Sequence, residues 1–176
     1  MRILTLIAAI TTIAIAMGAC TGSIDNKQLA ATADSLRSAG VPDSLATLGA
    51  KALLMDADDF ANTQAQILIN DLATGSVNAE KATVVMNDIN AIAKRVGRDD
   101  TADAFNKALD RLANELPLDK QMLVYTRATT PESLAKALKQ ELNQPGADRT
   151  LIQRQIEQAR KIYSGDDLDA FNKALE

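Results

Sequence analysis

Residues 78–116 read NAEKATVVMNDINAIAKRVGRDDTADAFNKALDRLANEL, and this stretch decides the fold. Apolar residues recur at intervals of three and four, which is the period of an amphipathic helix, and polar residues occupy the opposite face. Two helices are predicted, over 78–96 and over 99–116, and Pro117 ends the second. Asp99 and Asp100 suit its start, where carboxylates meet free backbone amides. The two apolar stripes consist of Ala82, Val85, Met86, Ile89, Ile92, Ala93 and Val96, and of Phe105, Leu109, Leu112 and Leu116.

Helix signals continue to the C-terminus. Thr130 is a capping residue and Pro131 fits the first helical position, which together predict a helix that ends before Pro145. Asp148 begins the next predicted helix, and Asp166 opens the last one. The corresponding stripes are Leu134, Leu138 and Leu142; Leu151, Ile152, Ile156, Ala159, Ile162 and Tyr163; and Leu168, Phe171 and Leu175.

Towards the N-terminus, helices are predicted over residues 27–38, 43–55 and 56–72. In the last of these, Phe60, Ile67, Leu68 and Leu72 are expected to face inward. Residues 118–127 are compatible with another helix, although their β-branched and aromatic residues disfavour it. We therefore expect an all-α fold of about six to eight helices, built as a helical bundle or as packed helical hairpins. Residues 27–176 are expected to form a single domain.

Composition excludes several classes of function. The 176 residues include no histidine, no tryptophan and one cysteine, and the net charge is −4. Zinc, copper and non-haem iron sites draw mainly on Cys and His, and Ser-His and Cys-His nucleophile pairs require histidine. Lys and Arg are not clustered, so nucleic-acid binding is not expected. With no Gly-x-Ser-x-Gly elbow and no Gly-rich phosphate loop, we expect no cofactor, no metal and no enzymatic activity.

Three acidic pairs are the strongest candidates for a metal or acid–base site: Asp58-Asp59, Asp99-Asp100 and Asp166-Asp167. Clustered carboxylates bind calcium or exchange protons. Each pair, however, falls at or near a predicted helix start, where carboxylates stabilise the free amides and the positive end of the helix dipole. None has the ligand spacing of a helix-loop-helix calcium site. We interpret the pairs as capping residues.

An eight-residue motif occurs twice. DAFNKALD at 103–110 returns as DAFNKALE at 169–176, with seven identities. Phe105 and Phe171 share their stripes with leucines and are expected in the core. The polar neighbours Asn106, Lys107, Asn172 and Lys173 form a candidate interaction face. The motif does not recur at the constant interval of about 34 residues that a tetratricopeptide array requires.

The N-terminus has the three parts of a secretory signal: a cation, Arg2; an apolar run, residues 3–17; and two small residues before Cys20. Met17-Gly18-Ala19-Cys20 resembles the lipobox of bacterial lipoproteins, with Met at a position where Leu is usual. The resemblance covers this segment only, and the helical remainder resembles no family. It implies that Cys20 receives a diacylglycerol, that the chain is cut between Ala19 and Cys20, and that the freed amine receives a further acyl chain such as palmitate.

Two alternatives for this segment remain open. A transmembrane anchor needs about 20 apolar residues, and this run is shorter. An ordinary cleaved signal fits Met-Gly-Ala, but it gives no role to the lone cysteine at the first mature position. Under the lipoprotein interpretation, 1–19 is the signal, 20–26 is a lipidated tether, and several acyl chains on Cys20 anchor the protein stably in a bilayer. Thr21 follows the cysteine in place of Asp, and by resemblance to enterobacterial lipoproteins this favours the outer membrane.

The sequence thus predicts a lipoprotein of the bacterial cell envelope with a non-catalytic binding, adaptor or structural role and an envelope protein as partner. Two alternatives remain: an envelope enzyme that uses carboxylates alone, and a subunit of a larger envelope complex. Convergence of carboxylates in one deep pocket would favour the enzyme. An exposed apolar patch of more than a few hundred Å² would favour the subunit.

Overall fold

The computed structural model describes residues 24–176, and within them the chain is helical with no strand. The all-α prediction is confirmed. Nine helices occur in this part of the chain, one more than the upper end of the expected range, because the ambiguous segment after Pro117 forms a helix of its own. Their bounds are α2 Asn26–Ser38, α3 Asp43–Leu54, α4 Ala57–Thr74, α5 Ala79–Arg95, α6 Asp99–Asn114, α7 Leu118–Ala128, α8 Pro131–Leu142, α9 Arg149–Ile162 and α10 Gly165–Leu175.

Two helices begin at the capping residues that the sequence predicts. Thr130 caps α8 by accepting a hydrogen bond from the Ser133 amide, and Pro131 occupies the first helical position. Asp148 caps α9 by accepting from the Leu151 amide at 3.0 Å. Among the described residues, no helix has both the length and the apolar character needed to cross a bilayer.

The described chain divides into two compact units, and each is described by itself. Unit 1 comprises residues 24–66 and 84–110, and unit 2 comprises Ile67–Thr83 and Arg111–Glu176. The expectation of a single domain over 27–176 stays a prediction.

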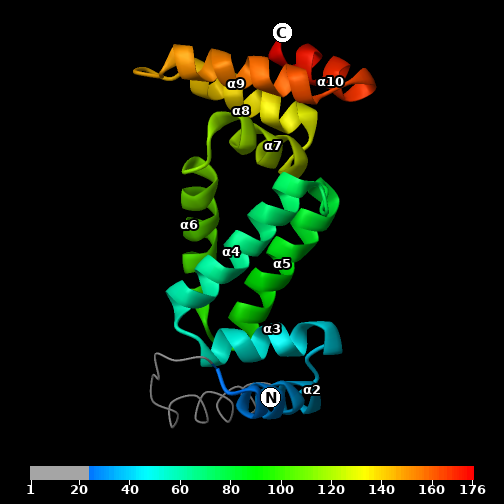
Figure 1. Ribbon diagram of the computed structural model, residues 1–176, viewed down its shortest axis with the longest axis vertical. Helices are drawn as coiled ribbons and strands as arrows, with labels where there is room; N and C mark the ends of the chain where they lie inside the picture. The colour runs from blue at the N-terminus through cyan, green and yellow to red at the C-terminus, as the bar shows by residue number, and fades with distance from the viewer. Residues whose placement is uncertain (1–23) are drawn as a thin grey trace, which may run out of the picture. The chain divides into compact units, whose positions relative to one another are not determined.

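In unit 1, α2 and α3 lie side by side (Figure 1). Their contact is close because α3 carries Gly49: a Cβ built there would lie 2.9 Å from Ile92 Cγ1 and 3.0 Å from Leu36 Cδ1. Leu36 and Ile92 are each 1% exposed. The glycine therefore lets the α3 backbone approach α2 and α5 more closely than any other residue would. Phe60 and Phe105 are fully buried, which confirms the predicted core position of Phe105.

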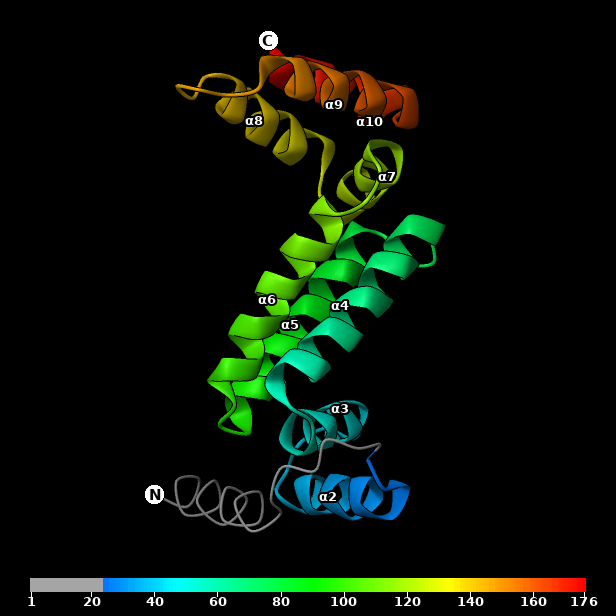
Figure 2. The same cartoon turned by 60° about the vertical axis from the view of Figure 1, so that its left-hand side comes forward.

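In unit 2, α8 packs against α10 and α9, and α7 packs against α9 (Figure 2). The predicted core position of Phe171 is confirmed, since this side chain is fully buried. Its ring lies 5.3 Å from the ring of Tyr163, tilted by 45°, a favourable arrangement for two aromatic rings. The core of this unit consists of Met122, Leu134, Ala135, Leu138, Ile152, Ile156, Ala159, Tyr163 and Phe171.

Two predicted inward residues face outward. Ile67 is 50% exposed and Leu151 is 43% exposed. Each lies one position, or about 100° of helix rotation, from the buried stripe of its helix. On α4 that stripe runs through Phe60, Ala61, Ala65, Leu68, Ile69 and Leu72, and on α9 it runs through Ile152, Gln155, Ile156 and Ala159. Small and amide residues take inward places that the apolar pattern alone gives to larger side chains.

Candidate functional site

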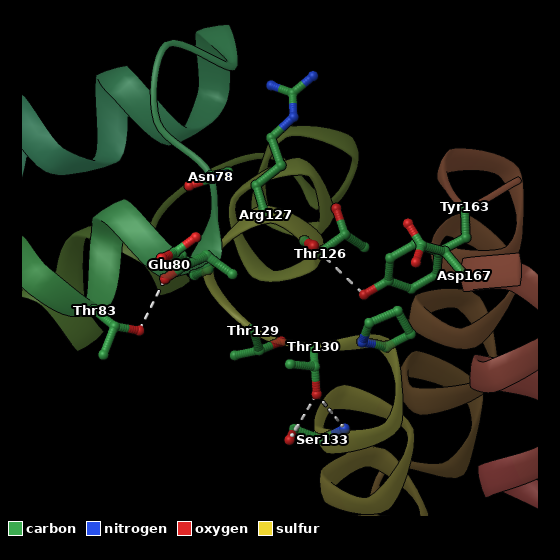
Figure 3. A pocket seen from close by; sticks show the side chains of 13 residues that line it. Asn78, Glu80, Thr83, Thr126, Arg127, Thr129, Thr130, Ser133, Tyr163 and Asp167 are labelled. Carbon is green, nitrogen blue, oxygen red and sulfur yellow. Dashed lines mark hydrogen bonds between the residues drawn. The ribbon is translucent and has the colours of Figure 1, made fainter.

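The candidate site is a groove of about 710 Å³ in unit 2. Five helices contribute their ends to it: the first turns of α5, α8 and α10, the last turn of α7, and Tyr163 just after α9. The segment Thr126–Pro131, from the last turn of α7 to the first residue of α8, forms one wall. Glu80 and Asp167 lie on opposite sides of the groove (Figure 3). Helix ends bring polar backbone groups and capping side chains into one place, which explains why the lining is rich in hydroxyls.

Two threonine hydroxyls of the groove bond back to the backbone of α7. Thr126 Oγ1 donates to Met122 O at 2.8 Å, and Thr129 Oγ1 donates to Tyr125 O at 2.9 Å. Such bonds back to the preceding turn are usual for threonine in helices. Each hydroxyl oxygen retains capacity to accept a hydrogen bond from a ligand.

Ser133 is the only serine that lines the groove, and its hydroxyl lies 3.0 Å from Thr130 Oγ1, which also caps α8 (Figure 3). The hydroxyl thus belongs to a cap. A serine nucleophile needs a neighbouring base that takes its proton, and the group bonded to this serine is a second hydroxyl.

Tyr163 closes the inner side of the groove. The residue is 9% exposed, and its hydroxyl donates a long bond of 3.5 Å to Thr126 O. Burial raises the pKa of Tyr163 to about 12, and the negative charges of Asp167 and Glu132 contribute in the same direction. At neutral pH the phenol is therefore a protonated donor on an aromatic ring and not a base.

Arg127 lines the groove, but its guanidinium donates hydrogen bonds to backbone carbonyls of α4. Nη1 donates to Leu72 O at 2.8 Å and to Ala73 O at 2.7 Å. Both carbonyls belong to the last turn of α4, where helical amide partners are lacking, and Leu72 O also accepts from the Gly75 amide at 3.2 Å. Figure 3 shows the side chain directed away from Tyr163 and Asp167.

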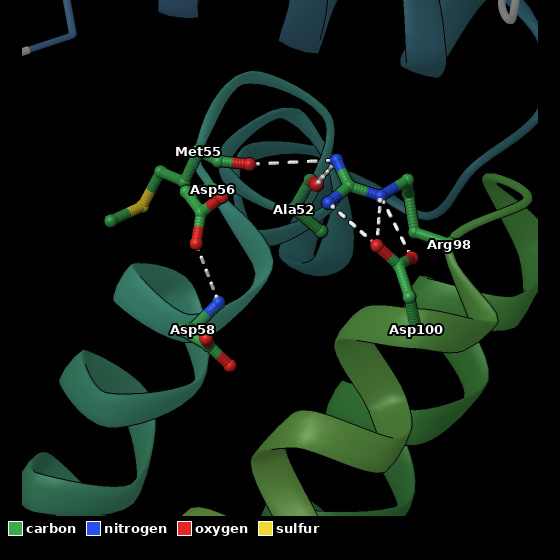
Figure 4. Close-up of polar contacts among 6 residues, drawn as sticks. All are labelled: Ala52, Met55, Asp56, Asp58, Arg98 and Asp100. Atoms are coloured by element: carbon green, nitrogen blue, oxygen red, sulfur yellow. Dashed lines mark hydrogen bonds and ion pairs between the residues drawn. The ribbon is translucent and has the colours of Figure 1, made fainter. Parts of the chain in front are cut away.

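A second polar cluster, in unit 1, has a structural role. Arg98 Nη1 donates to Ala52 O at 3.0 Å and to Met55 O at 3.4 Å, around the end of α3. The same guanidinium binds Asp100 through Nε and Nη2, at 2.9 and 3.1 Å (Figure 4). The hydrogen bond to Arg98 lowers the pKa of Asp100. The cluster joins the start of α6 to the end of α3.

The acidic pairs occupy the predicted places at helix starts. Asp58-Asp59, Asp99-Asp100 and Asp166-Asp167 lie in the first turns of α4, α6 and α10. The cap of α4 is Asp56, which accepts from the Asp58 amide at 2.9 Å (Figure 4). Among the described residues, no three acidic or cysteine side chains are grouped so that they could hold a metal ion.

The predicted interaction face is distributed over both units. Asn106 and Lys107 belong to unit 1, and Asn172 and Lys173 belong to unit 2. Asn106 exchanges two hydrogen bonds with Asn90, at 3.1 and 3.4 Å. Asn172 accepts one from Arg160 at 2.9 Å. Both asparagines therefore bond a neighbouring helix, while both lysines are exposed.

Cys20 and Ala19, the predicted lipidation and cleavage residues, lie outside the described residues. The patterns in the sequence do not predict the groove. Its signal is the polar run Thr126–Ser133, TRATTPES, between two apolar helices, but the run alone does not reveal that the ends of three other helices meet there.

No protein-family model, curated protein or solved structure matches this chain.

Proposed function

We propose that the chain is a bacterial lipoprotein, held in the cell envelope by acyl chains on Cys20, whose helical part is a non-catalytic binding module. The observation that carries the proposal is the order of Arg2, the apolar run 3–17 and the sequence Met17-Gly18-Ala19-Cys20. The chain has no other cysteine. A single thiol directly after a signal-like segment has a clear role as an acyl acceptor and no disulfide partner within the chain.

The start of the first described helix defines the length of the tether. Asp25 caps α2 by accepting from the Lys27 amide at 3.1 Å, so the helix begins at Asn26. Residues 20–25 then connect the lipid to the helix. At 3.3–3.6 Å per extended residue they reach about 20 Å. A tether of this length keeps α2 close to the surface of the bilayer that holds the acyl chains, and Thr21 favours the outer membrane as that bilayer.

The lining of the groove supports binding in preference to catalysis. Its serine is part of a helix cap, its tyrosine stays protonated at neutral pH, and its arginine holds the end of α4. The carboxylates of Glu80 and Asp167 face each other across the groove (Figure 3). An acid and a base that act on one bond must both reach the same reacting group. Here the two carboxylates come from opposite sides of the groove, and we infer that they bind a ligand and do not act as such a pair.

Metabolic labelling tests the anchor. The full chain is expressed in a bacterium fed an alkyne fatty acid, alongside Cys20→Ala and the matched control Thr21→Ala. We expect label and membrane fractionation for the wild type and for Thr21→Ala, and neither for Cys20→Ala. An unlabelled wild type in the soluble fraction would contradict the proposal.

The non-catalytic role needs a separate test. Isolated envelope polymers are incubated with the purified full chain, with Glu80→Gln and with Asp167→Asn, and the products are examined by mass spectrometry. We expect no released fragments with any of the three proteins. Fragments released by the wild type and lost in either variant would establish the carboxylate enzyme instead.

A further inference from the structure

We propose that the groove of unit 2 binds a short extended segment of a partner polypeptide through a Lys or Arg side chain of that segment. This inference deepens the proposed function, because it assigns the class of ligand to the binding module. It does not depend on acylation of Cys20.

Carboxylates outnumber cations in the lining of the groove, two to one. Glu80 and Asp167 line it, and Glu132 acts on the Tyr163 hydroxyl together with Asp167. The one arginine of the lining is committed to the carbonyls of Leu72 and Ala73. These bonds leave the positive charge of Arg127 in place, so the lining has a formal charge of −1, and the guanidinium is directed away from Asp167 (Figure 3).

The helix ends around the groove differ in polarity. The positive ends of α5, α8 and α10 have their own acidic residues in the first turn, and Asn78 and Thr130 cap α5 and α8. The end of α7 presents the opposite polarity, because the last carbonyls of a helix lack backbone donors and carry the negative end of the dipole. Thr126 O, in this turn, accepts only a long bond from Tyr163. Arg127 lies in this last turn, and Thr126 O can accept a further hydrogen bond from a donor on the ligand.

The size and surface of the groove favour a side chain on a polypeptide over a small free amine. A volume of about 710 Å³ is within the range of 300–1,000 Å³ typical of ligand sites. Ala79, Ala128 and Pro131 provide apolar contacts for the aliphatic stem of a lysine or arginine. The carboxylate of Asp167 lies on the same side as Tyr163 and can accept from the charged end (Figure 3), and the threonine oxygens along α7–α8 can accept from a peptide backbone.

Calorimetry on the full chain in detergent tests the proposal, with acetyl-Lys-Ala-Lys-amide as the probe. We expect saturable binding that is weakened about tenfold in the double variant Glu80→Gln, Asp167→Asn. Asp169→Asn is the matched control: Asp169 is exposed on the same helix as Asp167 but does not line the groove, so its affinity should equal that of the wild type. Circular dichroism and thermal unfolding of each variant separate loss of binding from loss of folding.

Two further probes decide the chemistry of the ligand. Acetyl-Glu-Ala-Glu-amide should not bind, and cadaverine should bind at least tenfold more weakly than the cationic peptide. Absence of binding by the cationic peptide, equal binding of the acidic peptide, or unchanged affinity in a folded double variant would overturn the cationic specificity. Cadaverine binding as tight as that of the peptide would overturn the polypeptide as ligand. A wild type that lacks acyl chains but binds the peptide would contradict only the proposed anchor.

Discussion

Arginine side chains complete the ends of three helices. Arg95 Nη2 donates to Gly40 O after α2, Arg98 donates to Ala52 O at the end of α3, and Arg127 donates to two carbonyls at the end of α4. The last carbonyls of a helix have no intrahelical donor, and a guanidinium supplies several donors along with a charge of favourable sign. Residues distant in sequence thus hold successive helix ends within each unit.

Replacing Arg127 with alanine should destabilise the protein by about 1–3 kcal/mol, because Leu72 O and Ala73 O lose a charged donor in a partly buried place. Urea unfolding followed by circular dichroism measures the change. Arg154→Ala is the control, since Arg154 is an exposed residue of α9 in the same unit, and it should change stability by less than about 0.5 kcal/mol. Equal stability of Arg127→Ala and Arg154→Ala would show that the capping bonds contribute nothing.

The Tyr163 hydroxyl should ionise at a higher pH than an ordinary tyrosine. The chain has two tyrosines, so Tyr125→Phe leaves Tyr163 as the only phenol, and its absorbance at 295 nm should rise with a midpoint near pH 12. An unfolded tyrosine ionises near pH 10. Between these values the unfolded state binds fewer protons, so stability should fall as the pH rises from about 10 to about 12. A midpoint near 10 while the far-ultraviolet dichroism is still native would contradict the buried hydroxyl.

Single residues were predictable where the signal is local. Thr130 and Asp148 cap the helices that they were expected to cap, because capping depends on the next three residues only. The roles of Arg98 and Arg127 depend on carbonyls about 45–55 residues away, and no local pattern indicates them. Tyr163 is a further example: its place in an apolar stripe predicts a core residue, and no local pattern indicates that it also lines the groove.

At the scale of the element, Gly49 shows where packing outweighs helix propensity. Gly49→Ala gains about 1 kcal/mol of helix propensity, but the new methyl group would lie 2.9 Å from Ile92 Cγ1 in a fully buried contact. Overpacking of this kind costs about 1–3 kcal/mol. We expect Gly49→Ala to be less stable than the wild type by about 1 kcal/mol in urea unfolding.

Thr47→Ala provides the comparison for this prediction. Thr47 is exposed on α3, so alanine there gains propensity without a clash and should stabilise the protein slightly. If Gly49→Ala were as stabilising as Thr47→Ala, the close contact between α3 and its neighbours would be wrong.

Element positions were largely predictable, because an apolar period of 3.6 residues occurs in α5, α6, α8, α9 and α10, and side-chain caps begin α5, α8 and α9. The segment 118–127 was ambiguous because intrinsic propensity opposes a helix there. Burial of Met122 and Val124 overrides it. Ile67 and Leu151 were misplaced because size and hydropathy alone do not distinguish the centre of a stripe from its edge.

At the scale of the whole molecule, the proposed anchor rests on the sequence and the proposed binding groove rests on the structure. The division into two units could not be predicted, since the two units alternate along the chain and no linker separates them. The groove could not be predicted either, because it forms where the ends of five helices meet. Under the proposed acylation of Cys20, the short connection from Cys20 to Asn26 would restrict the helical part to ligands near the bilayer surface.

The most direct test of the account is the mass of the N-terminal tryptic peptide of the protein isolated from a bacterium that processes lipoproteins. We predict a peptide that begins at Cys20 and ends at Lys27, with a diacylglycerol on the sulfur and a third acyl chain on the amine. A peptide that retains residues before Cys20, or one that carries a free thiol at that position, would contradict the lipid anchor.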